Sequence, residues 1–333
     1  MGSSALRVAV VGAGANGGSV GADLIEAGAD VTLIEQWPEH VQAMRTDGLT
    51  IRLPDRELHV EPRALHVCEV AELRHPFDVV LLMMKAYDTR WAAELIAPLV
   101  AEGGVLAAVQ NGMTTDAASV RGRRAVGTVI EVSSTLLGPG TVRRHTPPDS
   151  SWFAVDADPR ADRVAALLAS AGRVERIGDI DSAKWMKLVS NCSLLATTAL
   201  LGMPMLDARD LPGMRDLMIA ASSEALAVGR ARGHAVLPIF GLVAADLDEP
   251  DAVAATLLDA VYGFVRPGAI TTVLQDWRAS RRSETEDLNG LVVAEGARLG
   301  IPTPVNERIA GLARRVERGD LQPGPANAAA LTT

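Results

Sequence analysis

The sequence predicts an α/β N-terminal domain with a doubly wound, mostly parallel sheet, followed by an all-α C-terminal domain. Two observations carry this prediction. Apolar, β-branched runs of strand length alternate with stretches of helical spacing over residues 7–177, as in βαβ units. From residue 181 strand signals nearly vanish, and helical spacing continues to residue 318. We therefore expect domains at 1–180 and 181–320, and a loose tail at 321–333, which lacks periodicity.

Composition narrows the class of protein. The 333 residues suffice for two domains, and 48% hydrophobic with 22% charged residues is typical of a soluble globular chain. A net charge of −9 and 3% aromatic residues disfavour nucleic acid as a partner. No apolar run is long enough to span a membrane. Cys68 and Cys192 lie far apart without a metal-ligand pattern, which indicates a reducing cytoplasm and no metal site.

The first predicted strand, residues 7–11, leads into a glycine-rich turn. The turn reads Gly12, Ala13, Gly14, Ala15, Asn16 and Gly17, and helical spacing follows at 20–25. In this pattern the first glycine allows the turn, the second lets phosphates approach, and the third lets the helix pack on the strand. Glu35 follows the next predicted strand, 31–34, at 35 − 12 = 23 positions after Gly12, where an acid binds the ribose. The sequence therefore predicts a dinucleotide site in a Rossmann domain.

Two further strands end in polar residues. The apolar run 77–84 stops at Lys85, and the run 104–109 stops at Gln110-Asn111-Gly112. Because the carboxyl ends of parallel strands meet at one edge, we expect Lys85 and Asn111 beside Gly12 and Glu35. Other expected elements of this domain are helices at 38–46, 89–99 and 161–170, a hairpin of 48–53 with 58–61, and strands at 125–135, 141–144 and 174–177. Expected helices of the second domain are 182–201, 211–232, 240–247, 251–265, 274–283, 284–299 and 306–318.

The helical domain carries the candidates for proton transfer. A nicotinamide supplies a hydride, so the protein must supply a proton for the developing alkoxide. Lys187 and Asn191 are four apart on one helix face, and Glu284 opens a predicted helix. Spacing alone also fits a surface lysine and a helix-capping glutamate. The six histidines are scattered and fit surface or core roles.

The order of these pieces resembles the ketopantoate reductases. The shared motifs are Gly12-Ala13-Gly14, Met84-Lys85-Ala86, Gln110-Asn111-Gly112, Trp185 to Asn191, Leu274-Gln275-Asp276, Arg282-Ser283-Glu284 with Leu288-Asn289-Gly290, and Ile301 to Asn306. They extend over residues 7–310, nearly the whole chain. The resemblance implies a Rossmann domain, an all-helical domain, an active site in the cleft between them, and reduction of a 2-keto acid by NAD(P)H.

The resemblance also implies roles for individual residues. Lys187 matches the family's general acid, and Asn191 matches a substrate-binding asparagine. Asn111 matches the residue between nicotinamide and substrate. Glu284 matches the acid that binds the substrate hydroxyl near the cofactor, and Lys85 matches the lysine after the fourth strand. Thr272 stands where the family usually has a carboxylate-binding serine. We expect Lys187 to be protonated at working pH, as an ammonium of ordinary pKa beside a carboxylate such as Glu284.

Two departures from the family change the expected ligands. Leu195 and Met205 stand where pantoate-using members carry asparagines, so we expect a substrate more apolar than ketopantoate. Glu35 stands where an arginine commonly pairs with the 2′-phosphate of NADPH, so we expect NADH. NADP is the alternative, with Arg45 folding back to that phosphate.

Three hypotheses about the function therefore stay open. The first is a reductase of the ketopantoate reductase type, acting on a 2-keto acid or related carbonyl compound, with ketopantoate itself, for pantothenate synthesis, as one candidate. The second is a 3-hydroxyacyl or imino-acid dehydrogenase of the same plan. The third is an NAD-binding sensor without turnover. In each, we expect no nucleic-acid, membrane or metal partner, and a homodimer formed through the helical domain.

Overall fold

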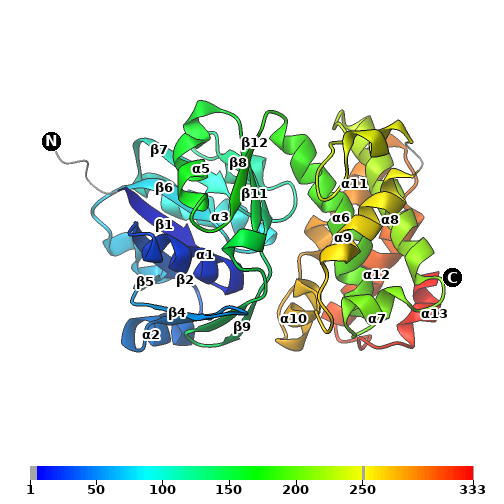
Figure 1. The fold of residues 1–333 in the computed structure, drawn as a ribbon, viewed down its shortest axis with the longest axis horizontal. Helices are drawn as coiled ribbons and strands as arrows, with labels where there is room; N and C mark the ends of the chain where they lie inside the picture. The colour runs from blue at the N-terminus through cyan, green and yellow to red at the C-terminus, as the bar shows by residue number, and fades with distance from the viewer. Residues whose placement is uncertain (1–5, 250–251, 333) are drawn as a thin grey trace. The chain divides into compact units, whose positions relative to one another are not determined.

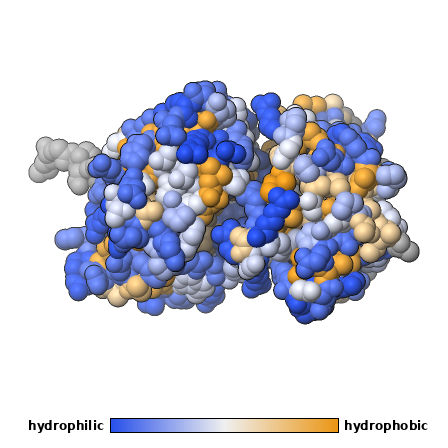
Figure 2. Space-filling view, turned by 90° about the horizontal axis from the view of Figure 1, so that it is seen from below, coloured by the Kyte–Doolittle hydropathy of each residue, from blue (hydrophilic) through white to orange (hydrophobic). Residues whose placement is uncertain are grey.

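The computed structural model describes residues 6–249 and 252–332. The chain forms two compact units, Met1–Ile180 and Asp181–Thr333 (Figure 1). Figure 2 shows hydrophilic residues over most of the visible face of each unit, with smaller hydrophobic areas among them. Among the described residues, no helix has both the length and the apolar character that crossing a bilayer requires.

An eight-stranded sheet forms the centre of the first unit. The strands lie in the order β12-β11-β8-β7-β6-β1-β2-β5. Their bounds are β1 Arg7–Val11, β2 Asp30–Glu35, β5 Arg63–His66, β6 Phe77–Leu82, β7 Val100–Ala108, β8 Val126–Glu131, β11 Trp152–Asp156 and β12 Arg173–Ile177. Neighbours run parallel except β11, which is antiparallel to β8. The predicted doubly wound, mostly parallel sheet is confirmed.

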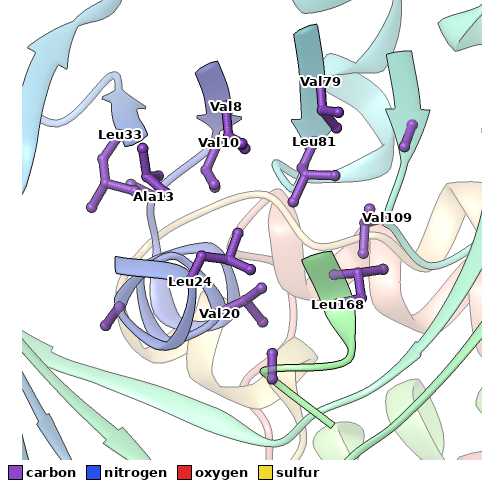
Figure 3. Close-up of a cluster of buried hydrophobic side chains, with 14 of the residues drawn as sticks. Val8, Val10, Ala13, Val20, Leu24, Leu33, Val79, Leu81, Val109 and Leu168 are labelled. Atoms are coloured by element: carbon purple, nitrogen blue, oxygen red, sulfur yellow. The ribbon is translucent and has the colours of Figure 1, made fainter. Parts of the chain in front are cut away.

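Helices cover both faces of this sheet because its strands are apolar on both sides. Val8 and Val10 of β1 pack with Val20 and Leu24 of α1 in one core (Figure 3). The alternate residues of β1 belong to a second core, which includes residues of α3. The helices of this unit are α1 Ala15–Glu26, α2 Pro38–Thr46, α3 Thr89–Ile96, α4 Thr115–Ala118 and α5 Asp162–Leu168.

A smaller, four-stranded sheet has the order β4-β3-β10-β9. Its strands are β3 Leu49–Arg52, β4 Glu57–Val60, β9 Ser134–Gly138 and β10 Thr141–Arg144. The predicted hairpin is β3 paired antiparallel with β4. The single strand predicted over 125–135 is wrong, because the chain leaves the large sheet after Glu131 and enters the small one at Ser134. Neither β5 nor β11 was expected, since each is a short run of four or five residues.

The second unit is helical, as predicted. Its helices are α6 Ile180–Leu200, α7 Met205–Arg209, α8 Met214–Ala231, α9 Val253–Phe264, α10 Thr272–Arg278, α11 Asn289–Leu299, α12 Pro304–Glu317 and α13 Asn327–Thr332. The helix predicted at 240–247 is wrong: Phe240 and Gly241 have φ of 59° and 90°, and only a 3-10 turn, η6 Ala244–Asp248, follows. The helix predicted at 274–283 ends early, with Ser280 at φ 54°. The predicted start of helix 251–265 lies outside the described residues.

The loose tail predicted at 321–333 is also wrong over the residues described. Helix α13 is a short alanine-rich segment, and its Leu331 is fully buried. Asn327 donates through Nδ2 to the carbonyl of Leu200 at 2.8 Å, and Arg308 donates to the carbonyl of Leu331 at 2.8 Å. Six helical residues are too few to show a period in the sequence, but they suffice to bury one leucine against the bundle.

Candidate active site

The glycine-rich turn follows β1 and has the tight geometry that its pattern predicts. Gly12 has φ 92°, and a Cβ there would lie 2.5 Å from the backbone nitrogen of Met84. A Cβ on Gly17 would lie 1.9 Å from the carbonyl oxygen of Gly12. Only glycine fits at either position, so this turn holds the start of α1 close to β1.

The second glycine of the motif lies beside open space. A Cβ built on Gly14 would meet no heavy atom of the described residues within 4 Å. Gly14 is the N-cap of α1, with no side-chain cap and no acid in the first helical turn. In the part of the chain that the structure describes, the buried Oδ1 of Asn16 has no hydrogen-bond partner. This region, flanked by Ala13 and Ala15, offers an open, positively polarised helix start and an acceptor without a partner. Both features fit a dinucleotide: the helix start fits its phosphates, and the acceptor fits its hydroxyl or amide groups.

His40 of α2 supports this turn, a role that no sequence motif indicated. Its Nε2 lies 3.0 Å from the carbonyl oxygen of Ala13, and the Gly140 amide donates to Nδ1 at 2.9 Å. A carbonyl can only accept and an amide N–H can only donate, so the ring is neutral with its proton on Nε2. Burial lowers the pKa of His40, which favours this form. The hydrogen bond from His40 holds the carbonyl of Ala13 toward the ring. Because the C=O and N–H of a trans peptide point in opposite directions, the N–H of Gly14 points away from His40.

Glu35 ends β2 and is buried. Its Oε1 accepts hydrogen bonds from the backbone amides of Gln36 at 2.8 Å and Trp37 at 3.1 Å. Arg45, the residue considered for a cofactor phosphate, instead donates through Nε to the carbonyl of Ala64 at 2.9 Å and pairs with Glu69. Its guanidinium is therefore held at β5 and the turn that follows it.

The next two strand ends are joined by Gln110. Its Nε2 donates to the carbonyl of Met84 at 2.8 Å and to Oγ1 of Thr89 at 3.0 Å. This side chain links the end of β7 to the end of β6, and so it places Asn111 near Lys85. Strands β7, β6, β1 and β2 are neighbours and parallel, so the structure brings Asn111, Lys85, Gly12 and Glu35 to one edge of the sheet.

In the second unit, α6 carries three of the predicted residues on one face. Lys187, Asn191 and Leu195 are spaced by four residues within this helix. Asn191 is buried and Lys187 is half-buried. Burial lowers the pKa of Lys187 to about 7, so the ordinary ammonium pKa expected from the sequence is wrong. The Nζ of Lys187 lies 5.5 Å from the ring centroid of Phe240, a contact that no sequence motif indicated.

Thr272 and the two apolar replacements belong to one neighbourhood of this unit. Thr272 begins α10, and Oγ1 of the preceding Thr271 donates to the carbonyl of Leu195 at 3.0 Å. The amide of Met205 donates to the carbonyl of Ala269 at 2.9 Å. The segment 269–272 thus lies against both Leu195 and Met205.

Glu284 is buried at the start of a 3-10 turn, η7 Thr285–Asp287. The helix predicted to begin at Glu284 begins instead at Asn289, because Leu288 breaks it with φ −114° and ψ −92°. Asn289 donates through Nδ2 to the carbonyl of Cys192 at 3.0 Å and to Oδ1 of Asn306 at 2.9 Å. These bonds anchor the segment after Glu284 to α6, one residue beyond Asn191.

Comparison with known proteins identifies the family of this chain. The family described as ketopantoate reductase PanE/ApbA matches residues 8–156, and its C-terminal counterpart matches residues 179–317. A 2-dehydropantoate 2-reductase of Caulobacter vibrioides is 30% identical over 315 residues, 92% of this chain and 97% of that protein. The crystal structure of a PanE/ApbA family ketopantoate reductase from Ralstonia eutropha JMP134 is 30% identical, with a TM-score of 0.81 over 95% of this chain and 99% of that one.

A more distant structure shares the fold. D-mandelate dehydrogenase with NADH and anilino(oxo)acetate is 19% identical, with a TM-score of 0.82 over 94% of this chain and 99% of that one. Family matches over most of the chain, together with a relative of 30% identity across nearly its full length, establish the family. The chain belongs to the ketopantoate reductase family of NAD(P)-dependent oxidoreductases.

Proposed function

We propose that this protein reduces a 2-keto acid or related carbonyl compound with NADH, with Lys187 as the general acid. The observation that carries the proposal is the face of α6, where Lys187 precedes Asn191 and Leu195 at helical spacing. Lys187 has a pKa near 7, which suits proton transfer at neutral pH in either direction.

The proposed mechanism divides the work among residues of both units. NAD(P)H supplies the hydride that is transferred to the carbonyl carbon. The edge formed by Gly12, Gly14 and Glu35 holds the dinucleotide, with Lys85 and Asn111 at its nicotinamide end. Lys187 donates a proton from Nζ to the carbonyl oxygen, and it is left as a neutral amine.

The substrate is positioned by the other residues of the second unit. Asn191 and Thr272 bind the polar end of the substrate, and Glu284 accepts a hydrogen bond from the new hydroxyl. Glu284 also lies near the cofactor in this proposal. These assignments follow the family motifs matched in the sequence, and Lys187 would contribute about 10²- to 10⁴-fold to the rate.

The proposed substrate has a larger apolar part than ketopantoate. Leu195 and Met205 lie against the segment that ends in Thr272, and neither offers a side-chain hydrogen bond. A site built to hydrogen-bond substrate hydroxyls rejects analogues that lack them, because the polar groups of the site would then be buried without partners. With Leu195 and Met205 in these positions, the site lacks that basis for preferring ketopantoate. Ketopantoate is the second candidate, favoured by the name of the 30% identical relative.

We infer that NADH is preferred over NADPH. Glu35 is a buried carboxylate at the end of β2, where a 2′-phosphate would bring like charges together. Arg45 is engaged by Ala64 and Glu69 and offers this phosphate no compensation. A homodimer through the helical domain is also part of the proposal, and light scattering after gel filtration tests it.

The experiment is a steady-state comparison of substrates with both cofactors. We expect the highest kcat/KM with NADH and an apolar 2-keto acid such as 3-methyl-2-oxobutanoate or benzoylformate, and a much lower value with ketopantoate. Ketopantoate as the best substrate would overturn the apolar preference. Turnover only with 3-hydroxyacyl or imino substrates would favour a 3-hydroxyacyl or imino-acid dehydrogenase. NADH binding without turnover would favour an NAD-binding sensor.

A further inference from the structure

The segment between α8 and α9 is held along α6 beside Lys187. The ring of His234 stacks on Trp185 of α6, with centroids 4.9 Å apart. The backbone amide of Ala235 donates to Oγ of Ser182, also in α6, at 2.8 Å. Five residues later, the ring of Phe240 lies 5.5 Å from Nζ of Lys187. Three successive contacts with one helix fix the path of this segment.

Phe240 occupies a backbone conformation that costs free energy. Its φ is 59°, in the left-handed region, where bulky side chains are rare. The two residues that flank the corner, Ile239 and Leu242, are buried. Gly241 has φ 90°, and a Cβ on it would lie 2.9 Å from Cβ of Ala260 in α9. The corner therefore packs closely against α9. A strained backbone of this kind persists where the surrounding packing holds it in place.

The position of the ring relative to Nζ determines what else it can touch. An acid that protonates a carbonyl lies about 2.6–3.2 Å from the oxygen. The carbon atoms bonded to the carbonyl carbon then lie only a few bonds away from Nζ. A ring whose centroid is 5.5 Å from Nζ lies within reach of ordinary carbon–carbon contact with one of these substituents.

The geometry points to Phe240 as a specificity-determining residue, whose ring forms one wall of the pocket for the apolar substituent of the 2-keto acid. This inference rests on the proposed role of Lys187. It also gives the strained corner a purpose, because the left-handed backbone presents the ring to Lys187 while Ile239 and Leu242 stay in the core. The same ring face attracts the Lys187 ammonium and holds its side chain in place.

Phe240→Gly is the informative variant, because glycine adopts φ 59° without strain while the ring is lost. We expect the ratio of kcat/KM for benzoylformate to that for pyruvate to fall about tenfold or more, mainly through a higher KM for benzoylformate. Phe240→Trp should keep the ratio within about threefold of the wild-type value, since it restores an aromatic face. An unchanged ratio in Phe240→Gly would overturn the inference.

Two matched variants separate this effect from general damage. Phe264→Ala removes an aromatic ring that is 74% exposed on α9, and Leu242→Ala removes a buried side chain of the same corner. We expect Phe264→Ala to keep the wild-type ratio, and we expect Leu242→Ala to lower the melting temperature while its ratio falls less than in Phe240→Gly. If Phe264→Ala lowered the ratio as much as Phe240→Gly, the effect would not belong to the ring of Phe240. The proposed function fails separately, if Lys187→Ala retains wild-type turnover with pyruvate.

Discussion

The pH dependence of turnover in the two directions tests the role of Lys187 in depth. Lys187 must carry a proton to reduce a carbonyl, and it must be neutral to accept one when the hydroxy acid is oxidised. Burial lowers its pKa to about 7, well below that of an exposed lysine. Below this pKa the ammonium form dominates, and above it the protonated fraction falls tenfold per pH unit.

The expected changes in kcat/KM with pH follow from this pKa. At saturating NADH, kcat/KM for reduction should be flat below about pH 6 and roughly 100-fold lower at pH 9. At saturating NAD, kcat/KM for oxidation should show the mirror image, rising tenfold per unit up to about pH 7 and flat above it. The assay follows NADH absorbance in both directions with one substrate pair and overlapping buffers.

A matched variant identifies the group that titrates. Lys187→Arg keeps a positive charge that does not titrate below pH 12. The limb of the pH–rate profile near neutral pH should therefore disappear, and the rate should be lower at every pH. The reasoning is refuted if wild-type reduction stays flat to pH 9, or if the limb near pH 7 persists in Lys187→Arg.

Three further predictions concern stability and cofactor binding. His40→Phe fills the same space without its two hydrogen bonds, so the Kd for NADH should rise about tenfold in a fluorescence titration, and a Kd unchanged with a lower melting temperature would leave His40 only a structural role. Glu35→Gln should raise NADPH affinity relative to NADH by about tenfold or more; no change in this ratio would contradict the charge argument. Lys187→Met should raise the free energy of unfolding, by up to about 5 kcal/mol below pH 7, because at about 1.4 kcal/mol per unit a pKa lowered from 10.5 to about 7 penalises the folded state. That gain should shrink as pH rises from 7 to 10.5, and a gain independent of pH in urea unfolding would contradict the burial argument.

The proposed cofactor site, at one edge of the sheet, could be predicted from the sequence because its signals are local. Gly12, Glu35, Lys85 and Asn111 each end an apolar run, and parallel strands place such ends at one edge. The roles of the two tight glycines follow from the spacing alone, and the structure shows the close contacts that exclude a side chain there.

Features that depend on distant residues could not be predicted. His40 contacts Ala13 and Gly140, which lie 27 and 100 positions away, and its own helix has an ordinary pattern. Phe240 fell in a stretch with helical spacing, and the left-handed corner becomes apparent only in the fold, where Ile239 and Leu242 are buried and Gly241 lies close to α9. The lowered pKa of Lys187 likewise arises from burial in the folded protein, which a local motif does not reveal.

The most direct test of the account is a crystal structure of the complex with NADH and a non-reactive 2-keto acid analogue. We predict Nζ of Lys187 within hydrogen-bond distance, about 2.6–3.2 Å, of the oxygen that replaces the reacting carbonyl, with the nicotinamide ring against the adjacent carbon. An analogue bound in contact with the nicotinamide while Nζ of Lys187 lies beyond the reach of one bridging water would contradict the central claim.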